Sequence, residues 1–289
     1  MSRRKNSRFL IGYGIFLCFC ALWAGFLWKE WASLSPSETR GTKETEQAEK
    51  AEIKEENIPY PTTLPPSQRA PESAAFPSQV SPPGKVLLSV PYLSQENRLP
   101  TGCEVVSTVM LLQYYSIWMD THAFIDRYLD CGELEMHGKM RYGPDPNEAF
   151  VGSPYRSDGF GCYAPVIQNA LEKLFREKGS ACQVKNTTGS SLETLCSKYV
   201  AKGTPVLVWA SINMVPIEDG LEWFLNGSGE LFTWTKNEHC LVLVGYDAEN
   251  YYFNDPYQSN GVVSYEKELV NQRYREMHQQ SLIIESGAL

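Results

Sequence analysis

The stretch HCLVLVGYDAENYYFNDPY, residues 239–257, decides how this chain folds. Its run LVLVGY is apolar and rich in β-branched residues, and the aromatic run YYF follows a few positions later. The residues between them, which begin with Asp247, are typical of a turn. The stretch therefore predicts a β-hairpin.

The predicted hairpin brings a histidine and a carboxylate together. With the turn centred near Asp247, His239 lies opposite Asp255, and opposed residues of an antiparallel pair share one face of the sheet. Asn254 and Cys240 then point to the other side, although a register shift of one residue would exchange Asp255 for Asn254. A lone histidine at a strand start is usually structural, but the opposed Asp255 favours a catalytic base.

The stretch TGCEVVSTVMLLQYY, residues 101–115, predicts a helix that begins beside a cysteine. Thr101 and Glu104 have the spacing of a capping box, which would make Thr101 the N-cap and Cys103 the second helical residue. A helix N-terminus stabilises a thiolate, so we expect the pKa of Cys103 to be lowered, and a free amide there could bind an oxyanion. The alternative is a small buried thiol that only packs.

Together these motifs resemble a known family. The order Gln95, Cys103, His239, Asp255, with VPYLSQ before the thiol and the hairpin near the end, is similar to the stand-alone bacterial C39-like peptidases. These are papain-like cysteine peptidases related to the double-glycine leader peptidases of bacteriocin transporters. The resemblance covers nearly all of residues 86–285.

The resemblance implies an α+β papain-like fold in which a helix carrying the thiol packs on an antiparallel sheet. It implies that Cys103 is the nucleophile, His239 the general base and acid, and Asp255 the carboxylate that orients the imidazole. It also implies that the amide of Gln95 contributes to the oxyanion hole. Eight positions separate Gln95 from Cys103, more than is usual in papain-like enzymes, so Gln95 could instead be a polar residue that ends a strand.

Other segments of the domain lead to further expectations. Cys162 also precedes a predicted helix, residues 164–178, which makes it the alternative nucleophile. It lacks a capping box and an upstream glutamine, so we expect it to be structural. Residues 191–202 predict another helix, and PVLVWASI predicts a buried central strand. Residues 214–237 carry four aromatic side chains that we expect to pack in the core, although a loop that covers the substrate is an alternative.

Composition narrows the classes of function. Residues 86–289 contain 25 acidic and 15 basic residues, a net charge of −10, so nucleic acid is not expected as a partner. No CxxC or Cys/His zinc spacing occurs, and we expect neither a metal nor a cofactor. The domain has six of the eight cysteines, whose pairing the sequence leaves open.

The N-terminal part has a different composition. After a basic tail (residues 1–8), residues 9–28 contain no charge and are long enough to cross a bilayer, with the N-terminus on the cytoplasmic side. A cleaved signal peptide is the alternative. Residues 29–85 are rich in Glu, Lys and Pro and predict a disordered linker to the domain at 86–289.

We therefore expect a single-pass protein of the cell membrane with an extracytoplasmic cysteine peptidase or amide hydrolase that acts on a peptide or protein through an acyl-enzyme. One alternative is acyl transfer or cleavage of wall peptides by the same triad. Another is a binding module that keeps the fold without catalysis.

Overall fold

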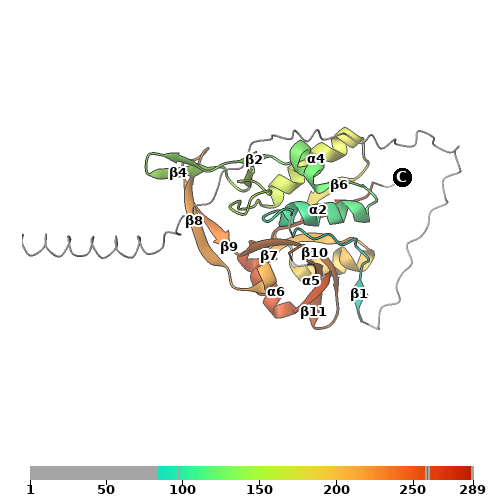
Figure 1. Ribbon diagram of the computed structural model, residues 1–289. Coiled ribbons are helices and arrows are strands. Elements are labelled where there is room, and N and C mark those ends of the chain that lie inside the picture. The colour runs from blue at the N-terminus through green and yellow to red at the C-terminus, as the bar shows by residue number, and fades with distance from the viewer. Residues whose placement is uncertain (1–83, 97, 258, 260, 288–289) are drawn as a thin grey trace, which may run out of the picture. The chain divides into compact units, whose positions relative to one another are not determined.

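The computed structural model (Figure 1) describes residues 84–96, 98–257, 259 and 261–287. These residues form an α+β domain of helices and antiparallel sheet. The helices are α2 (Cys103–Tyr114), α3 (Thr121–Tyr128), α4 (Ala164–Lys178), α5 (Leu192–Lys198) and α6 (Lys267–Glu276), with short 3-10 helices η1 (Val200–Lys202) and η2 (Ile212–Met214). The strands are β1 (Val86–Leu87), β2 (Cys131–Gly132), β3 (Glu135–His137), β4 (Met140–Gly143), β5 (Phe150–Val151), β6 (Gln183–Asn186), β7 (Val206–Ser211), β8 (Glu218–Leu225), β9 (Leu231–Lys236), β10 (Glu238–Tyr246), β11 (Asn250–Asn254), β12 (Val262–Glu266) and β13 (Ser281–Glu285).

The largest sheet contains the predicted hairpin. Its strands lie in the order β12-β11-β10-β7-β13-β6, and β1 pairs with the end of β10. All of these pairings are antiparallel. The segment PVLVWASI forms β7, whose six residues are all buried. The prediction of a buried central strand is therefore confirmed.

Helices cover both faces of this sheet. Figure 1 shows α2 and α4 on one side of β7 and β10, and α5 and α6 on the other. Successive strand residues alternate between two cores: Trp209 and Cys240 pack with α2 and α4, whereas Val208 and Leu241 pack with α5 and α6. Because both faces are buried, the central strands are continuous apolar runs with no polar alternation.

A four-stranded sheet, ordered β3-β4-β8-β9, contains most of the segment 214–237, for which a loop over the substrate was the alternative. Most of residues 214–237 form the β8–β9 hairpin with NGSG in its turn, so the segment is not an irregular loop. Trp223 and Trp234 are 1% and 6% exposed, which confirms that these two indoles pack in the core. The strands are held by the indoles packing on the body of the domain. A separate parallel pair joins β2 to β5.

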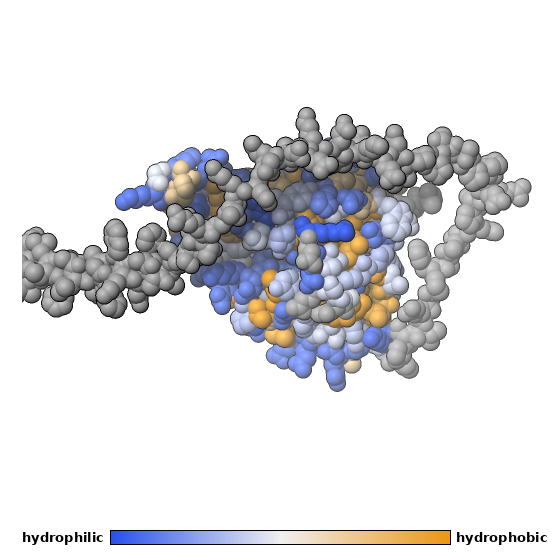
Figure 2. All heavy atoms as spheres, in the orientation of Figure 1, coloured by the Kyte–Doolittle hydropathy of each residue, from blue (hydrophilic) through white to orange (hydrophobic). Residues whose placement is uncertain are grey.

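The small sheet also carries apolar side chains at the surface. Met136, Met140 and Leu231, on β3, β4 and β9, are among the most exposed large apolar residues of the described chain. On the face seen in Figure 2, hydrophobic residues occur in several groups between hydrophilic ones. The small sheet thus meets solvent with apolar side chains, whereas the large sheet is covered on both faces.

The predicted helices are largely observed. Helix α4 has the predicted bounds, with Pro165 in its first turn and Gly179 in the left-handed conformation at its end (φ 59°). The predicted helix at 191–202 is interrupted at Tyr199, which separates α5 from η1. Tyr199 and Val200 are both buried in the core beside α5. The break in the helix therefore coincides with burial of two consecutive side chains.

The N-terminal predictions lie outside the described residues. This applies to the basic tail at 1–8, the membrane anchor at 9–28 and all but the last two positions of the linker at 29–85. Within the part of the chain that the structure describes, no helix is both long and apolar enough to span a bilayer.

Candidate active site

The N-terminus of α2 differs from the predicted capping box. The helix begins at Cys103, its N-cap residue is Gly102, and no side chain caps it. The hydroxyl of Thr101 donates instead to the carbonyl oxygens of Ser153 and Arg156, at 3.2 and 3.0 Å. The capping box is therefore wrong because a tertiary contact with residues distant in sequence captures the threonine hydroxyl. Cys103 is the first helical residue, not the second.

The residues before α2 coil into a compact turn. The carbonyl of Gln95 accepts hydrogen bonds from the amides of Arg98 and Leu99, and the amide of Gly102 donates to the Leu99 carbonyl at 3.0 Å. A Cβ on Gly102 would lie 2.7 Å from the Leu99 Cβ, so a larger residue does not fit there. The turn absorbs the extra residues between Gln95 and Cys103. It leaves the Gln95 side chain buried, with Nε2 donating to the Pro100 carbonyl at 3.2 Å and with Oε1 lacking a hydrogen-bond partner among the described residues.

The hairpin brings the predicted imidazole and carboxylate together by a different register. Val242 faces Asn254, which by extension would place His239 opposite Tyr257. The predicted direct opposition of His239 and Asp255 is therefore wrong by two residues. A shift of two keeps the same face of the sheet, because side chains alternate with a period of two. The contact itself is present: Nε2 of His239 lies 2.6 Å from Oδ1 of Asp255.

This pair is buried and well connected. His239 and Asp255 are 1% and 4% exposed. The same Oδ1 atom of Asp255 also accepts a hydrogen bond from the amide of Tyr257 at 2.9 Å. Burial pushes the pKa of Asp255 up, but the hydrogen bond and the charge of His239 outweigh it, and the pKa is lowered. As predicted, Asn254 points elsewhere: its amide donates to the carbonyl of Val90 at 3.0 Å.

A cavity of about 180 Å³ lies where α2 meets β10. Its lining includes Gln95, Cys103 and His239, so three of the four predicted site residues face one space, and Asp255 holds the imidazole of the third. The other lining residues are Pro100, Thr101, Phe160, Ile212, Trp234, Asn237, Glu238 and Tyr257.

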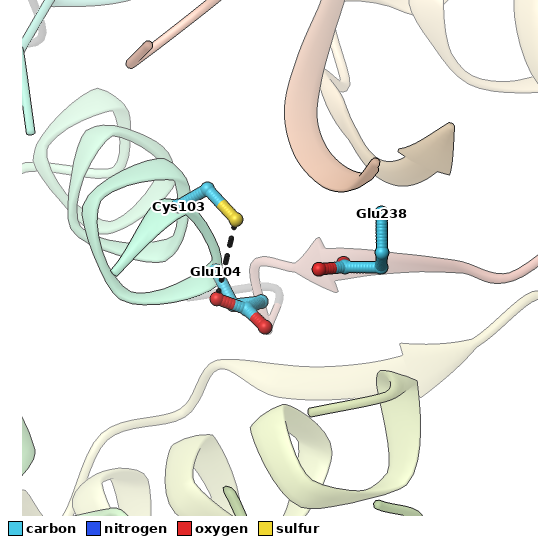
Figure 3. A group of neighbouring side chains, drawn as sticks. All are labelled: Cys103, Glu104 and Glu238. Atoms are coloured by element: carbon cyan, nitrogen blue, oxygen red, sulfur yellow. Dashed lines mark hydrogen bonds between the residues drawn. The ribbon is translucent and has the colours of Figure 1, made fainter. Parts of the chain in front are cut away.

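Two buried glutamates adjoin the thiol (Figure 3). The Sγ atom of Cys103 donates to Oε2 of Glu104 at 3.3 Å, and the side chain of Glu238, from β10, points toward the same place. Burial raises the pKa of Glu104 to about 7. Burial and the neighbouring Glu104 carboxyl also raise the pKa of Glu238.

Burial of the thiol, together with these glutamates, reverses the expected shift in its pKa. Burial, followed by the charges of Glu104 and Glu238, raises the pKa of Cys103 well above its usual value. The prediction that the helix N-terminus lowers this pKa is therefore wrong. In the conformation described, the protonated thiol is the favoured form of Cys103.

Comparison with known proteins identifies the family. The model of the Peptidase_C39 like family matches residues 87–282. The chain belongs to this C39-like family. The protein YvpB of Bacillus subtilis (strain 168), which is uncharacterised, is 30% identical over 196 residues, which make up 65% of this chain and 70% of YvpB. A Bacillus anthracis crystal structure, assigned as a C39-like peptidase, has 29% identity and a TM-score of 0.61 and covers 71% of this chain and 99% of its own.

Family membership confirms the resemblance noted from the motifs. The C39-like fold, with its helices and antiparallel sheet, agrees with the architecture described above, and the family is one of cysteine peptidases. The described chain has six cysteines, and all six are free thiols. Cys162 and Cys240 are completely buried in the core beside α2. The Cys162 amide donates to Glu104 Oε1 at 2.7 Å and its carbonyl accepts from Trp209 Nε1 at 2.9 Å, which supports a structural role.

Sequence reasoning missed one polar residue of this C39-like site. Glu238 lines the cavity and is 7% exposed, yet nothing singled it out beside the histidine that follows it. Glu104 was noticed only as a helix cap. A usable signal exists: charged residues are almost never fully buried unless paired, so a glutamate just before the buried apolar run of a central strand is unusual. The other three histidines of the chain, His122, His137 and His278, are exposed.

Proposed function

We propose that this protein is a cysteine peptidase or amide hydrolase in which Cys103 is the nucleophile, His239 the general base and acid, and Asp255 the orienting carboxylate. The observation that carries the proposal is the buried 2.6 Å contact between His239 and Asp255 at the cavity that Cys103 also lines. Because Nε2 of His239 is bound to Asp255, Nδ1 is the nitrogen left to exchange a proton with the thiol.

The proposed reaction follows acyl-enzyme chemistry. The thiol proton passes to Nδ1 of His239 while Sγ of Cys103 attacks the carbonyl carbon of the substrate. We propose two donors to the oxyanion. The first is the amide of Cys103, which has no partner within α2 because it belongs to the first turn. The second is the Nε2 hydrogen of Gln95 that is not bonded to the Pro100 carbonyl. The proton then moves to the leaving amine, and water hydrolyses the thioester.

The raised pKa of Cys103 specifies the resting state of this mechanism. The thiol starts protonated, and the imidazole removes its proton as the bond to carbon forms. The carboxylate of Asp255 favours this step because it stabilises the imidazolium that results. The lowered pKa of Asp255 keeps it ionised across the neutral range.

We also propose that residues 9–28 anchor the chain in the cell membrane, with the peptidase domain outside the cytoplasm and a peptide or protein as substrate. The uncharged twenty-residue segment and the basic residues before it support this arrangement. Nucleic acid is not a proposed partner, because the domain has an excess of acidic residues.

The test measures alkylation of Cys103 by iodoacetamide, followed site by site by mass spectrometry. We expect His239→Ala to slow labelling of Cys103 and leave the exposed Cys131 unchanged, whereas His122→Ala, the matched exposed histidine, affects neither. Equal labelling of Cys103 in wild type and His239→Ala would contradict the proposed base.

Turnover needs a separate measurement. Peptides derived from cell-surface proteins are incubated with the wild type and with Cys103→Ala, and the new N-termini are identified. Cleavage that disappears in Cys103→Ala supports the peptidase. Transfer of the acyl group to an added amine in place of cleavage would favour the acyl transferase, and neither product would favour the binding module.

A further inference from the structure

The two glutamates at Cys103 have no role in the proposed acyl-enzyme chemistry. They nevertheless place three potential metal ligands at one point: the ligand atoms of Cys103, Glu104 and Glu238 all lie within 4.8 Å of one another. Figure 3 shows the thiol and Glu104 projecting from the start of α2 and Glu238 reaching toward them from β10. The three residues are 6%, 0% and 7% exposed.

One atom of this cluster lacks the partner that burial requires. Oε1 of Glu238 is buried and forms no hydrogen bond within the described chain. No hydrogen bond between Glu238 and Glu104 is found among the described residues. A buried carboxyl oxygen without a partner is costly, and buried charges are normally paired or coordinate a metal. Glu104 differs, because its Oε1 accepts from the Cys162 amide.

We propose that Cys103, Glu104 and Glu238 bind a divalent zinc ion, and that bound zinc holds the nucleophile inactive. The inactivation rests on the proposed function, whereas the binding site does not. A thiolate with two carboxylates suits Zn²⁺ better than Mg²⁺ or Ca²⁺, which take oxygen ligands only.

The spacing of the ligand atoms is compatible with a zinc site. With Zn–S near ~2.3 Å and Zn–O near ~2.0 Å, tetrahedral geometry separates the ligand atoms by about 3.3–3.5 Å. The Sγ atom of Cys103 and Oε2 of Glu104 are already 3.3 Å apart. The remaining pairs need to approach by at most about 1.5 Å, which rotation of the Glu238 side chain can supply.

The cavity supplies both access and the fourth coordination position. Cys103 and Glu238 line it, so an ion that enters from solvent meets these two ligands first. On binding, the thiol proton and any proton on the carboxyls pass to solvent, the Zn–S bond forms, and water completes the coordination. No group is oxidised or reduced, and a chelator reverses the step.

The experiment uses the full chain with Cys18, Cys20, Cys131 and Cys182 replaced by Ser, which removes the two N-terminal thiols and, within the described chain, the two thiols that are not buried. Cd²⁺ is the probe because its bond to a thiolate has an ultraviolet charge-transfer band, and Zn²⁺ is then added to displace it. We expect one Cd²⁺ per chain, displaced by Zn²⁺, and no band when Cys103→Ser is added to this background.

Glu238→Gln should weaken Cd²⁺ binding by roughly tenfold or more. Replacing even a residue that only hydrogen-bonds to a metal ligand typically lowers the metal affinity by about tenfold to a hundredfold. Glu218→Gln, an exposed glutamate of β8, is the matched control and should bind as the parent does. Circular dichroism checks the fold; if Glu238→Gln does not fold, Glu104→Gln tests the same site from α2. Unchanged affinity in the folded variant would overturn the site.

Function and metal binding can fail separately. The charge-transfer band can depend on Cys103 and Glu238 while alkylation of Cys103 proceeds at the same rate with and without His239. That result would support the zinc site and refute the proposed catalysis. Alkylation that depends on His239, in a protein without that band, does the reverse. Where both are present, Zn²⁺ should suppress alkylation of Cys103, and undiminished alkylation of the zinc-loaded chain would overturn the inactivation.

Discussion

Replacing Asp255 by Asn separates the charge of this residue from its geometry. Both donors, Nε2 of His239 and the amide of Tyr257, converge on the single oxygen Oδ1. An asparagine that keeps its oxygen there retains both hydrogen bonds and loses only the negative charge. A hydrogen bond to a charged group is worth about 1.5–3 kcal/mol and a neutral one about 0.5–1.5 kcal/mol, so the loss is about 1–1.5 kcal/mol.

This loss falls on the pair in which the Cys103 proton has moved to His239. At about 1.4 kcal/mol for each tenfold change, Asp255→Asn should slow alkylation of Cys103 at neutral pH by roughly fivefold to tenfold. Asp255→Ala removes the whole interaction, about 3 kcal/mol, and should slow it roughly 150-fold.

The assay is the second-order rate of iodoacetamide labelling at Cys103, with Cys131 in the same molecules as the internal reference. The reasoning is refuted if Asp255→Asn labels at the wild-type rate, or if the Asn and Ala variants do not differ. A parallel change at Cys131 would mean that the variant had altered the fold rather than the pair.

Three further predictions concern the stability of the domain, all measured as the free energy of unfolding in urea. The carboxyl of Glu104 titrates near 7 when folded and near ~4.3 when unfolded, so the folded state holds its proton more tightly and stability falls as pH rises between these values. Between pH 4.5 and 8 the wild type should lose roughly 3 kcal/mol more than Glu104→Gln, and parallel pH profiles would count against this. Trp209→Phe leaves the buried Cys162 carbonyl without its donor and should cost about 1–3 kcal/mol; a neutral result would mean that another donor replaces the indole. Gly245→Ala places a Cβ 2.3 Å from the Val86 carbonyl oxygen and should cost about 1–3 kcal/mol by displacing β1, whereas unchanged stability would show that β1 contributes little.

Local patterns in the sequence were sufficient to predict most of the secondary structure near the site. The apolar run after His239 and the aromatic run after the turn predicted the hairpin, and Pro165 and Gly179 marked the first turn and the end of α4. These signals depend on backbone preferences of adjacent residues, which tertiary contacts leave largely unchanged here. The structure of segment 214–237 was harder to predict, because its aromatic side chains become buried only when the β8–β9 hairpin packs on the rest of the domain.

The contact between His239 and Asp255 shows how far such reasoning extends. The sequence determined which face of the sheet each side chain occupies, because a strand alternates with a period of two and an error of two positions changes no face. The tertiary structure decided the register: a bulge in β10 shifts the pairing between Leu243 and Gly245, and no local signal in the sequence marks it.

The surroundings of Cys103 depended on the tertiary structure alone. The sequence by itself placed a thiol at a helix start and predicted a capping box and a lowered pKa. The fold instead directs Thr101 to a distant loop and brings Glu238, 135 positions away along the chain, to the same thiol as Glu104. Burial and charge act through space rather than along the sequence, so the pKa of this cysteine and its potential metal ligands emerged only from the packing of α2 against β10.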